Sequence, residues 1–167
     1  LVLELDKRTT NLIVEESKRI YQEKLANTDP LTGAYNRRYL NEFTSDYLKI
    51  VKREENDFSL LIVDLDDFKK INDTYGHEIG DQVLIQFVKI AKETIRENDL
   101  IIRFGGDEFI ILLPNTSDIN AKFLANKIID KIGKYNMIAK VNFSISIGLS
   151  IYNENDSNID DVIQRAD

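Results

Sequence analysis

Cysteine and tryptophan are absent from the 167-residue sequence, and proline occurs only twice and histidine only once. Without cysteine the chain forms no disulfide framework and offers no thiolate for catalysis, while its redox compartment stays open. No apolar run approaches the roughly 18 to 20 residues of a membrane-spanning helix, and no signal-peptide pattern is visible. These absences exclude a disulfide-stapled domain, a thiol enzyme and a membrane-spanning domain.

Basic residues are scarce relative to acidic ones: 22 Lys and Arg stand against 29 Asp and Glu, a net charge of −7. This balance argues against broad binding to duplex DNA, so we expect no nucleic-acid polymer as a partner. A small anionic ligand remains compatible, because metal ions or a few local cationic side chains can hold a phosphate. The length and the 43% hydrophobic content favour one globular domain with a real core.

The first 27 residues contain neither glycine nor proline, which predicts a helix over 1–27. Its apolar positions at helical spacings are Leu5, Leu12, Ile13 and Ile20. Heptads this short and interrupted are a weak coiled-coil signal. Two interpretations stand: a helix that packs on its own domain or frays at the surface, or a signalling helix that couples an upstream sensory domain to the rest. Since the chain begins at Leu1 and ends within a helical pattern, we interpret it as a segment of a longer protein.

Pro30 and Gly33 break the first helix, and the remaining periodicities predict alternating helices and strands. The predicted helices cover 36–54, 67–73, 78–95, 117–131 (capped by Ser117 or Asp118 and ended by Gly133) and a last one from 158. The predicted strands cover 58–63, 100–104, 109–113 and 141–151. In the last strand apolar and small polar residues alternate strictly, so one face is expected in the core.

The order strand, helix, strand, strand, helix, strand predicts an α/β (α+β) fold with a split βαβ core and a mainly antiparallel sheet flanked by helices. In such a core the third strand lies between the first and second and runs antiparallel to both. The end of the first strand, at Asp64, is then expected beside the start of the third, at Asp107.

The stretch 103–109, Arg-Phe-Gly-Gly-Asp-Glu-Phe, lies between two apolar runs. Two glycines there predict a tight hairpin with positive φ at both central positions. Successive strand residues point to opposite faces, so the side chains of Asp107 and Glu108 cannot both face solvent on a sheet that is buried on one side. At least one of the two carboxylates is expected to have a function.

Carboxylates brought together repel each other unless they share a proton or a cation, and Mg²⁺ binds through one or two carboxylates plus substrate phosphates. Lys69 and Lys70 follow Asp64 on the short polar helix, and the backbone amides of 65–68 could form an anion-binding concavity. Together these groups suit in-line attack on a nucleoside triphosphate. Helix capping by the aspartates of 64–67 is the simpler alternative, and a calcium loop fits poorly.

Three segments, 29–38, 64–81 and 103–109, together resemble the GGDEF family of diguanylate cyclases, from about Asn27 to the end of the chain. The resemblance implies a palm-like fold, a linker or signalling helix at 1–27 and a catalytic domain at 28–167. It also implies condensation of two GTP into cyclic di-GMP with release of two pyrophosphates. The cofactor would be Mg²⁺ or Mn²⁺, and two protomers of a homodimer would each hold one GTP.

The resemblance also implies roles for individual residues. Asp64 and Asp107 would ligate the metal with the Leu65 carbonyl, Asp107 would accept a proton beside Glu108, and Lys69 would stabilise phosphate charge. The implied substrate-binding residues are Phe68, Lys70, Asn72, His77 and Asp81. An acceptor at Asp81 suits the donors of guanine, which favours GTP over ATP. Turn capping by Asn72, a dipole contact by Asp81 and a helix-entry role for His77 are the plainer alternatives.

Arg96 and Asp99 form an Arg-x-x-Asp pattern that resembles the inhibitory product site of the family. The planar guanidinium suits guanine and phosphate groups; a helix-terminal Arg and a turn Asp are the alternative. The family's final helix carries a Lys and often an Arg that reach the triphosphate, and this sequence stops before them, which could impair affinity and turnover. A silent module that binds GTP or cyclic di-GMP and regulates an attached domain is the alternative function. The substrate implies a cytoplasmic location, with membrane attachment possible through an upstream domain.

Overall fold

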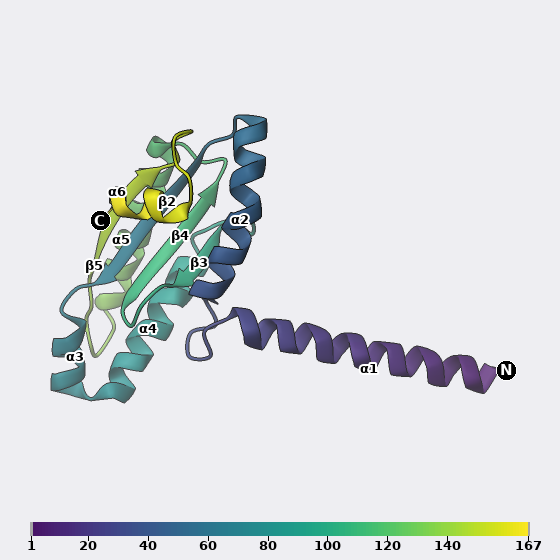
Figure 1. The fold of residues 1–167 in the computed structure, drawn as a ribbon. Coiled ribbons are helices and arrows are strands. Elements are labelled where there is room, and N and C mark those ends of the chain that lie inside the picture. Colours follow the sequence, from purple (N-terminus) through teal and green to yellow (C-terminus); the bar gives the residue numbers. More distant parts are fainter. Residues whose placement is uncertain (1, 167) are drawn as a thin grey trace.

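The computed structural model describes residues 2–166, with side chains described from residue 6 onward. Its helices are α1 (Val2–Asn27), α2 (Arg37–Glu54), α3 (Phe68–Tyr75), α4 (His77–Lys92), α5 (Asp118–Asn136) and α6 (Ile159–Ala166). Its strands are β1 (Tyr35–Asn36), β2 (Phe58–Leu65), β3 (Leu100–Arg103), β4 (Glu108–Pro114) and β5 (Ile145–Ile151). Figure 1 shows the sheet between layers of helices, with α1 projecting away from it.

The five strands form one sheet in the order β1-β3-β4-β2-β5. Strand β4 lies between β3 and β2 and runs antiparallel to both, which confirms the predicted split βαβ core. Strand β5 pairs antiparallel with the other side of β2. The two-residue β1, which pairs parallel with β3, was not predicted because two residues carry no periodicity.

Alternating residues of the central strands separate two apolar cores, one on each face of the sheet. Leu61, Val63 and Phe109 pack under α4 and α5. On the other face, Leu60 and Ile110 pack under α2 and α6. Because β2 and β4 are buried on both faces, they read as continuous apolar runs in the sequence.

A column of six aromatic rings runs along the second face. Neighbouring ring centroids in it are 4.1, 6.1, 5.1, 5.7 and 5.0 Å apart. In order, the rings belong to Tyr35, Tyr39, Phe43, Tyr47, Phe58 and Tyr152. Three of them are spaced four residues apart on α2, which brings their side chains onto one side of the helix. We call this set the aromatic column.

Three predicted boundaries were wrong by three or more residues. Helix α5 continues through Gly133 to Asn136, since a glycine inside a helix weakens it without ending it. Helix α4 ends at Lys92 rather than residue 95. The last strand begins at Ile145 rather than 141, because Asn136 binds the backbone of Phe143 through its Nδ2 (2.7 Å to the carbonyl) and Oδ1 (3.3 Å to the amide).

The predicted alternation of burial also fails at the end of β5. There Ser150 is buried beneath the helix layer, whereas Ile151 is 39% exposed at the edge of the sheet. The two-residue alternation in the sequence therefore predicted the strand. Which residues at its end are covered depends on the position of α6.

Helix α1 extends away from the body of the domain (Figure 1). Leu12, Ile13 and Ile20 are 63%, 61% and 55% exposed, so these residues are not packed on their own domain. The side chain of Leu5 lies outside the described residues. Within the described part of the chain, no helix is long and apolar enough to cross a membrane.

Candidate active site

The ends of β2 and β4 bring the predicted acidic residues together at one edge of the sheet. Asp64 is the register partner of Glu108, and the Leu65 amide donates to the Asp107 carbonyl at 3.2 Å. This is the juxtaposition that the strand order predicted. Asp64 and Glu108 are exposed, Asp107 is half-buried and Leu65 is buried. The site is thus an open carboxylate edge built on a rigid apolar strand pair.

The glycine loop between β3 and β4 differs from the predicted primed hairpin. Neither Gly105 nor Gly106 has a positive φ. The amides of Phe104 and Gly105 both donate to the Glu108 carbonyl, at 2.8 and 3.1 Å. At Gly105 an added Cβ would lie 2.8 Å from the Glu108 carboxylate. Close approach to Glu108, rather than backbone conformation, is what a side chain at Gly105 would disturb.

The environment of Asp64 disfavours the charged form of its carboxyl group. Its pKa is raised above its usual value, first by partial burial and then by the carboxylates of Asp107 and Asp66. Among the described residues, no group of three or more His, Cys, Asp or Glu side chains is arranged as a metal cluster. The donors that fit a hard divalent cation here are the two carboxylates Asp64 and Asp107 and the Leu65 carbonyl. This set matches Mg²⁺, which commonly takes its other ligands from water and substrate phosphates.

The segment 65–68 is arranged differently from both expectations stated for it. The Asp66 carboxylate accepts from Ser144 Oγ at 2.5 Å and Ser146 Oγ at 2.6 Å, which ties it to the start of β5. Asp67 precedes α3 in a left-handed conformation and makes no side-chain capping hydrogen bond. Helix capping is therefore the wrong explanation for Asp66 and Asp67.

The predicted anion-binding concavity is also smaller than expected. The Leu65 amide is engaged by Asp107, and the Asp66 amide donates to the Ser144 carbonyl at 2.9 Å. Only the amides of Asp67 and Phe68 remain as candidates, beside the exposed side chains of Lys69 and Lys70 at the start of α3.

The α3–α4 pair carries the predicted nucleotide-binding residues. Gly76 joins the two helices at φ 87°, which only glycine adopts readily. A Cβ on Gly80 would lie 1.8 Å from Asn72 Oδ1, so the Asn72 amide rests directly on the backbone of α4. Asp81 is the next residue and, like His77, is exposed. The structure thus places Asn72 against Gly80, the residue before Asp81, while the roles of the Asn72 and Asp81 side chains remain predictions.

Sequence reasoning gave Arg103 no role in the site, and it gave Asp29 only a capping role in the turn after the first helix. In the structure Arg103 contacts both Asp29 and the glycine loop. Arg103 donates through Nη1 to both carboxylate oxygens of Asp29 at 3.2 Å, and through Nη2 to the Gly106 carbonyl at 2.7 Å. Both residues belong to the recognised segments 29–38 and 103–109, which was the available signal. The pairing itself was not visible because 74 positions separate them.

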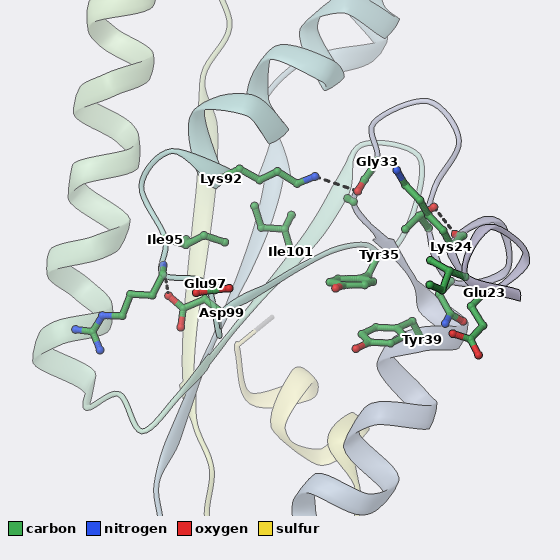
Figure 2. Close-up of a pocket in the computed structure, with 15 residues that line it drawn as sticks. Glu23, Lys24, Gly33, Tyr35, Tyr39, Lys92, Ile95, Glu97, Asp99 and Ile101 are labelled. Carbon is green, nitrogen blue, oxygen red and sulfur yellow. Dashed lines mark hydrogen bonds between the residues drawn. The ribbon is translucent and has the colours of Figure 1, made fainter. Parts of the chain in front are cut away.

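The predicted product site lies beside a cavity of about 640 Å³ between the end of α1 and the domain (Figure 2). Asp99 is buried and accepts from the Arg96 amide at 2.8 Å, and burial raises the pKa of its carboxyl group. This is the turn contact named as the alternative for Asp99, while the Arg96 side chain remains exposed. Figure 2 shows the rings of Tyr35 and Tyr39 across the cavity from Asp99.

Comparison with known proteins identifies the class. The sequence model described as "Diguanylate cyclase, GGDEF domain" matches residues 26–167. The chain therefore belongs to the GGDEF domain family, as its resemblance indicated.

Particular relatives agree with this assignment. The chain is 37% identical over 160 residues to diguanylate cyclase DgcM of Escherichia coli, covering 92% of this chain and 38% of the relative. It is also similar to the solved structure of diguanylate cyclase SiaD from Pseudomonas aeruginosa in complex with its activator SiaC. The TM-score is 0.82 and the sequence identity 27%, and the match covers 99% of this chain and 64% of the SiaD chain. The coiled coil and GGDEF domain of DgcB from Caulobacter crescentus, in complex with c-di-GMP, shares the fold at TM-score 0.84 and 21% identity over 99% and 91%.

Proposed function

We propose that this domain is a Mg²⁺-dependent diguanylate cyclase that condenses two GTP into cyclic di-GMP and two pyrophosphates across a homodimer. The observation that carries the proposal is the acidic edge, where Asp64 and Asp107 meet at the ends of β2 and β4. The raised pKa of Asp64 supports it: partial desolvation is the largest cause and the charges of Asp107 and Asp66 add to it, and a cation bound here would offset both effects. A purely structural domain would leave this edge unexplained.

In this proposal Asp64, Asp107 and the Leu65 carbonyl hold Mg²⁺, which neutralises charge on the phosphates when bound. Lys69 adds a positive charge near the triphosphate. Asp107 accepts the proton of the attacking 3′-hydroxyl, with Glu108 beside it. Asn72 and Asp81 hydrogen-bond the guanine edge, and Phe68, Lys70 and His77 line the nucleotide.

The chain spans about 38% of the length of DgcM, so further domains of the whole protein are part of the proposal. We assign residues 1–27 to a signalling helix and 28–167 to the catalytic domain. The exposed apolar residues of α1 support pairing of two protomers or coupling to an upstream sensory domain. A GTP substrate would imply a cytoplasmic catalytic domain, which an upstream domain could attach to a membrane.

A second candidate is a silent module that binds cyclic di-GMP, and the cavity beside Arg96 favours it. The cavity combines stacked tyrosine rings, 4.1 Å apart, with three cationic side chains and three acidic ones. The cationic residues are Lys24, Lys92 and Arg96, and the acidic residues are Glu23, Glu97 and Asp99. Its volume is in the range of small-ligand sites. Flat aromatic faces and cationic side chains are the groups that a guanine nucleotide would use.

The test is incubation of the protein with GTP and Mg²⁺, with products separated by chromatography. The wild-type chain is expected to form cyclic di-GMP, and Asp107→Ala to form at least about 100-fold less because a metal ligand is lost. Asp46→Ala is the matched control, since Asp46 is exposed on α2 and forms a surface ion pair with Lys49. Cyclic di-GMP binding without any product from the wild type, or from a version extended beyond Asp167, would favour the silent module.

A further inference from the structure

The segment that follows α1 is closed into a rigid turn around the side chain of Asp29. The Asp29 amide donates to the Ala34 carbonyl at 2.7 Å, and the Gly33 amide donates to the Asp29 carbonyl at 2.9 Å. The amide and the hydroxyl of Thr32 both donate to Asp29 Oδ2, at 2.9 and 2.7 Å. The carboxylate is therefore held in one orientation by its own turn, before any distant residue contacts it.

Arg103, the last residue of β3, connects this turn to the glycine loop. Its Nη1 contacts both oxygens of Asp29, while Nε and Nη2 donate to the Gly106 carbonyl at 3.1 and 2.7 Å. The two side chains are only 18% and 17% exposed. Burial works to raise the pKa of Asp29, but the hydrogen bonds from Thr32 and the Arg103 charge hold it below its usual value. Asp29 and Arg103 are thus both ionised, and the Arg103 guanidinium binds Asp29 on one side and the Gly106 carbonyl on the other.

The Gly106 carbonyl belongs to the peptide bond that leads into Asp107. On the other side of Asp107, its own carbonyl accepts from the Leu65 amide at 3.2 Å. The backbone on both sides of Asp107 is therefore held, by Arg103 on one side and by β2 on the other. A second contact comes from the start of α2, where the Arg37 guanidinium lies 4.4 Å from the centre of the Phe104 ring.

We propose that Asp29 and Arg103 are positioning residues that set the Asp107 carboxylate against Asp64 for metal binding. The inference rests on the function proposed above and extends it to residues outside the acidic edge. Asp29 lies two residues beyond the end of α1, so the same contacts connect the base of that helix to the metal-binding edge. Partners that orient a ligating group typically change metal affinity or activity by about 10- to 100-fold when removed.

The test uses two conservative variants, Arg103→Lys and Asp29→Asn. Lysine keeps the charge but, as a single ammonium group, cannot reproduce the fork that joins Asp29 to Gly106. Asparagine keeps the shape of Asp29 but removes its charge. Arg53→Lys and Asp46→Asn are the matched controls, because both residues are exposed on α2 and their ion pairs lie at the surface. Each protein is titrated with Mn²⁺ in the presence of GTP, with free Mn²⁺ measured by electron paramagnetic resonance, and kcat, KM and thermal unfolding are measured alongside.

We expect both variants to weaken Mn²⁺ binding by about tenfold and to lower kcat by a similar factor, with both controls at the wild-type value. A merely stabilising pair would lower the unfolding temperature and leave the Mn²⁺ midpoint unchanged, and that result would overturn the inference. If the wild type binds Mn²⁺ but forms no product, the cyclase proposal is refuted. The Mn²⁺ affinities of the two variants would still test whether Asp29 and Arg103 position Asp107. A wild type that binds neither Mn²⁺ nor GTP would overturn both.

Discussion

The aspartates near the two ends of β2 have opposite electrostatic environments. At the Leu65 end, Asp64 lies exposed beside other carboxylates, and its pKa is raised. Beyond the Phe58 end, Asp156 is 4% exposed and receives both Nη atoms of Arg165, with Nη2 at 2.7 Å. The hydrogen bond from Arg165 is the main cause that lowers the pKa of Asp156.

This contrast separates stability from function. The charge of Asp156 is compensated within the fold, and Arg165 also donates to the Ile151 carbonyl at 2.8 Å, so the pair fastens α6 to β5. The charge of Asp64 lies beside other carboxylates, and in the proposed function a cation would compensate it. A fold that tolerates uncompensated carboxylates at one end loses some stability there, which is a common property of functional sites.

The largest expected effect comes from removing the charge at the acidic end. Asp64→Asn should lower cyclic di-GMP formation by about 100-fold or more, because a metal ligand becomes a weaker neutral donor. The same substitution should leave the unfolding temperature unchanged or raise it, since repulsion from Asp107 and Asp66 is relieved. Initial rates and thermal melts at pH 7 measure the two. A clear loss of stability would contradict the description of Asp64 as uncompensated.

An intermediate effect is expected at the opposite end. Asp156→Asn should lower the free energy of unfolding by about 1–2 kcal/mol, a value reduced because Arg165 is 43% exposed. Cyclic di-GMP formation per folded molecule should not change, because Asp156 lies far from the carboxylate edge along β2. Urea denaturation at pH 7 measures the difference, with the exposed neighbour substitution Glu154→Gln as control. Equal stability of the two variants would refute the assignment.

The smallest expected effect is the dependence of these differences on pH. The lowered pKa of Asp156 contributes stability that is present above the unfolded value near 3.8 and lost as pH falls through the folded pKa. The raised pKa of Asp64 favours folding below 3.8, and this contribution is lost as pH rises through its folded pKa. The stability differences of Asp64→Asn and Asp156→Asn should therefore have opposite signs at neutral pH and shrink in acid. Denaturation series from pH 3 to 7 test it, and curves of the same sign would contradict it.

The strand order and the acidic edge could be predicted from the sequence because each rests on local signals. Buried strands such as β2 are continuous apolar runs, and the split βαβ order places Asp64 beside the start of β4 without further information. The boundaries at Gly133 and Ile145 could not be predicted in this way. A glycine can end a helix or lie within one, and the start of β5 depends on the contact between Asn136 and Phe143, which forms only in the folded chain.

The features of the candidate site that the sequence did not predict also depend on tertiary contacts. The glycines at 105 and 106 read as a primed turn, yet the loop is held by the Glu108 carbonyl and by Arg103. The helix-capping alternative for Asp66 was reasonable locally and fails because Ser144 and Ser146 reach it from β5. Sequence patterns identify which side chains a site contains, whereas long-range hydrogen bonds decide how those side chains are oriented.

The aromatic column provides an intrinsic spectroscopic signal for the packing of the domain. It contains four of the seven tyrosines, and the sequence has no tryptophan to mask their emission. Rings as close as 4.1 Å couple electronically, so their near-ultraviolet circular dichroism depends on the packing of neighbours. The column extends from Tyr35, beside the base of α1, to Tyr152, near the Asp156–Arg165 pair. Its spectrum would therefore follow both regions of the domain without an added label.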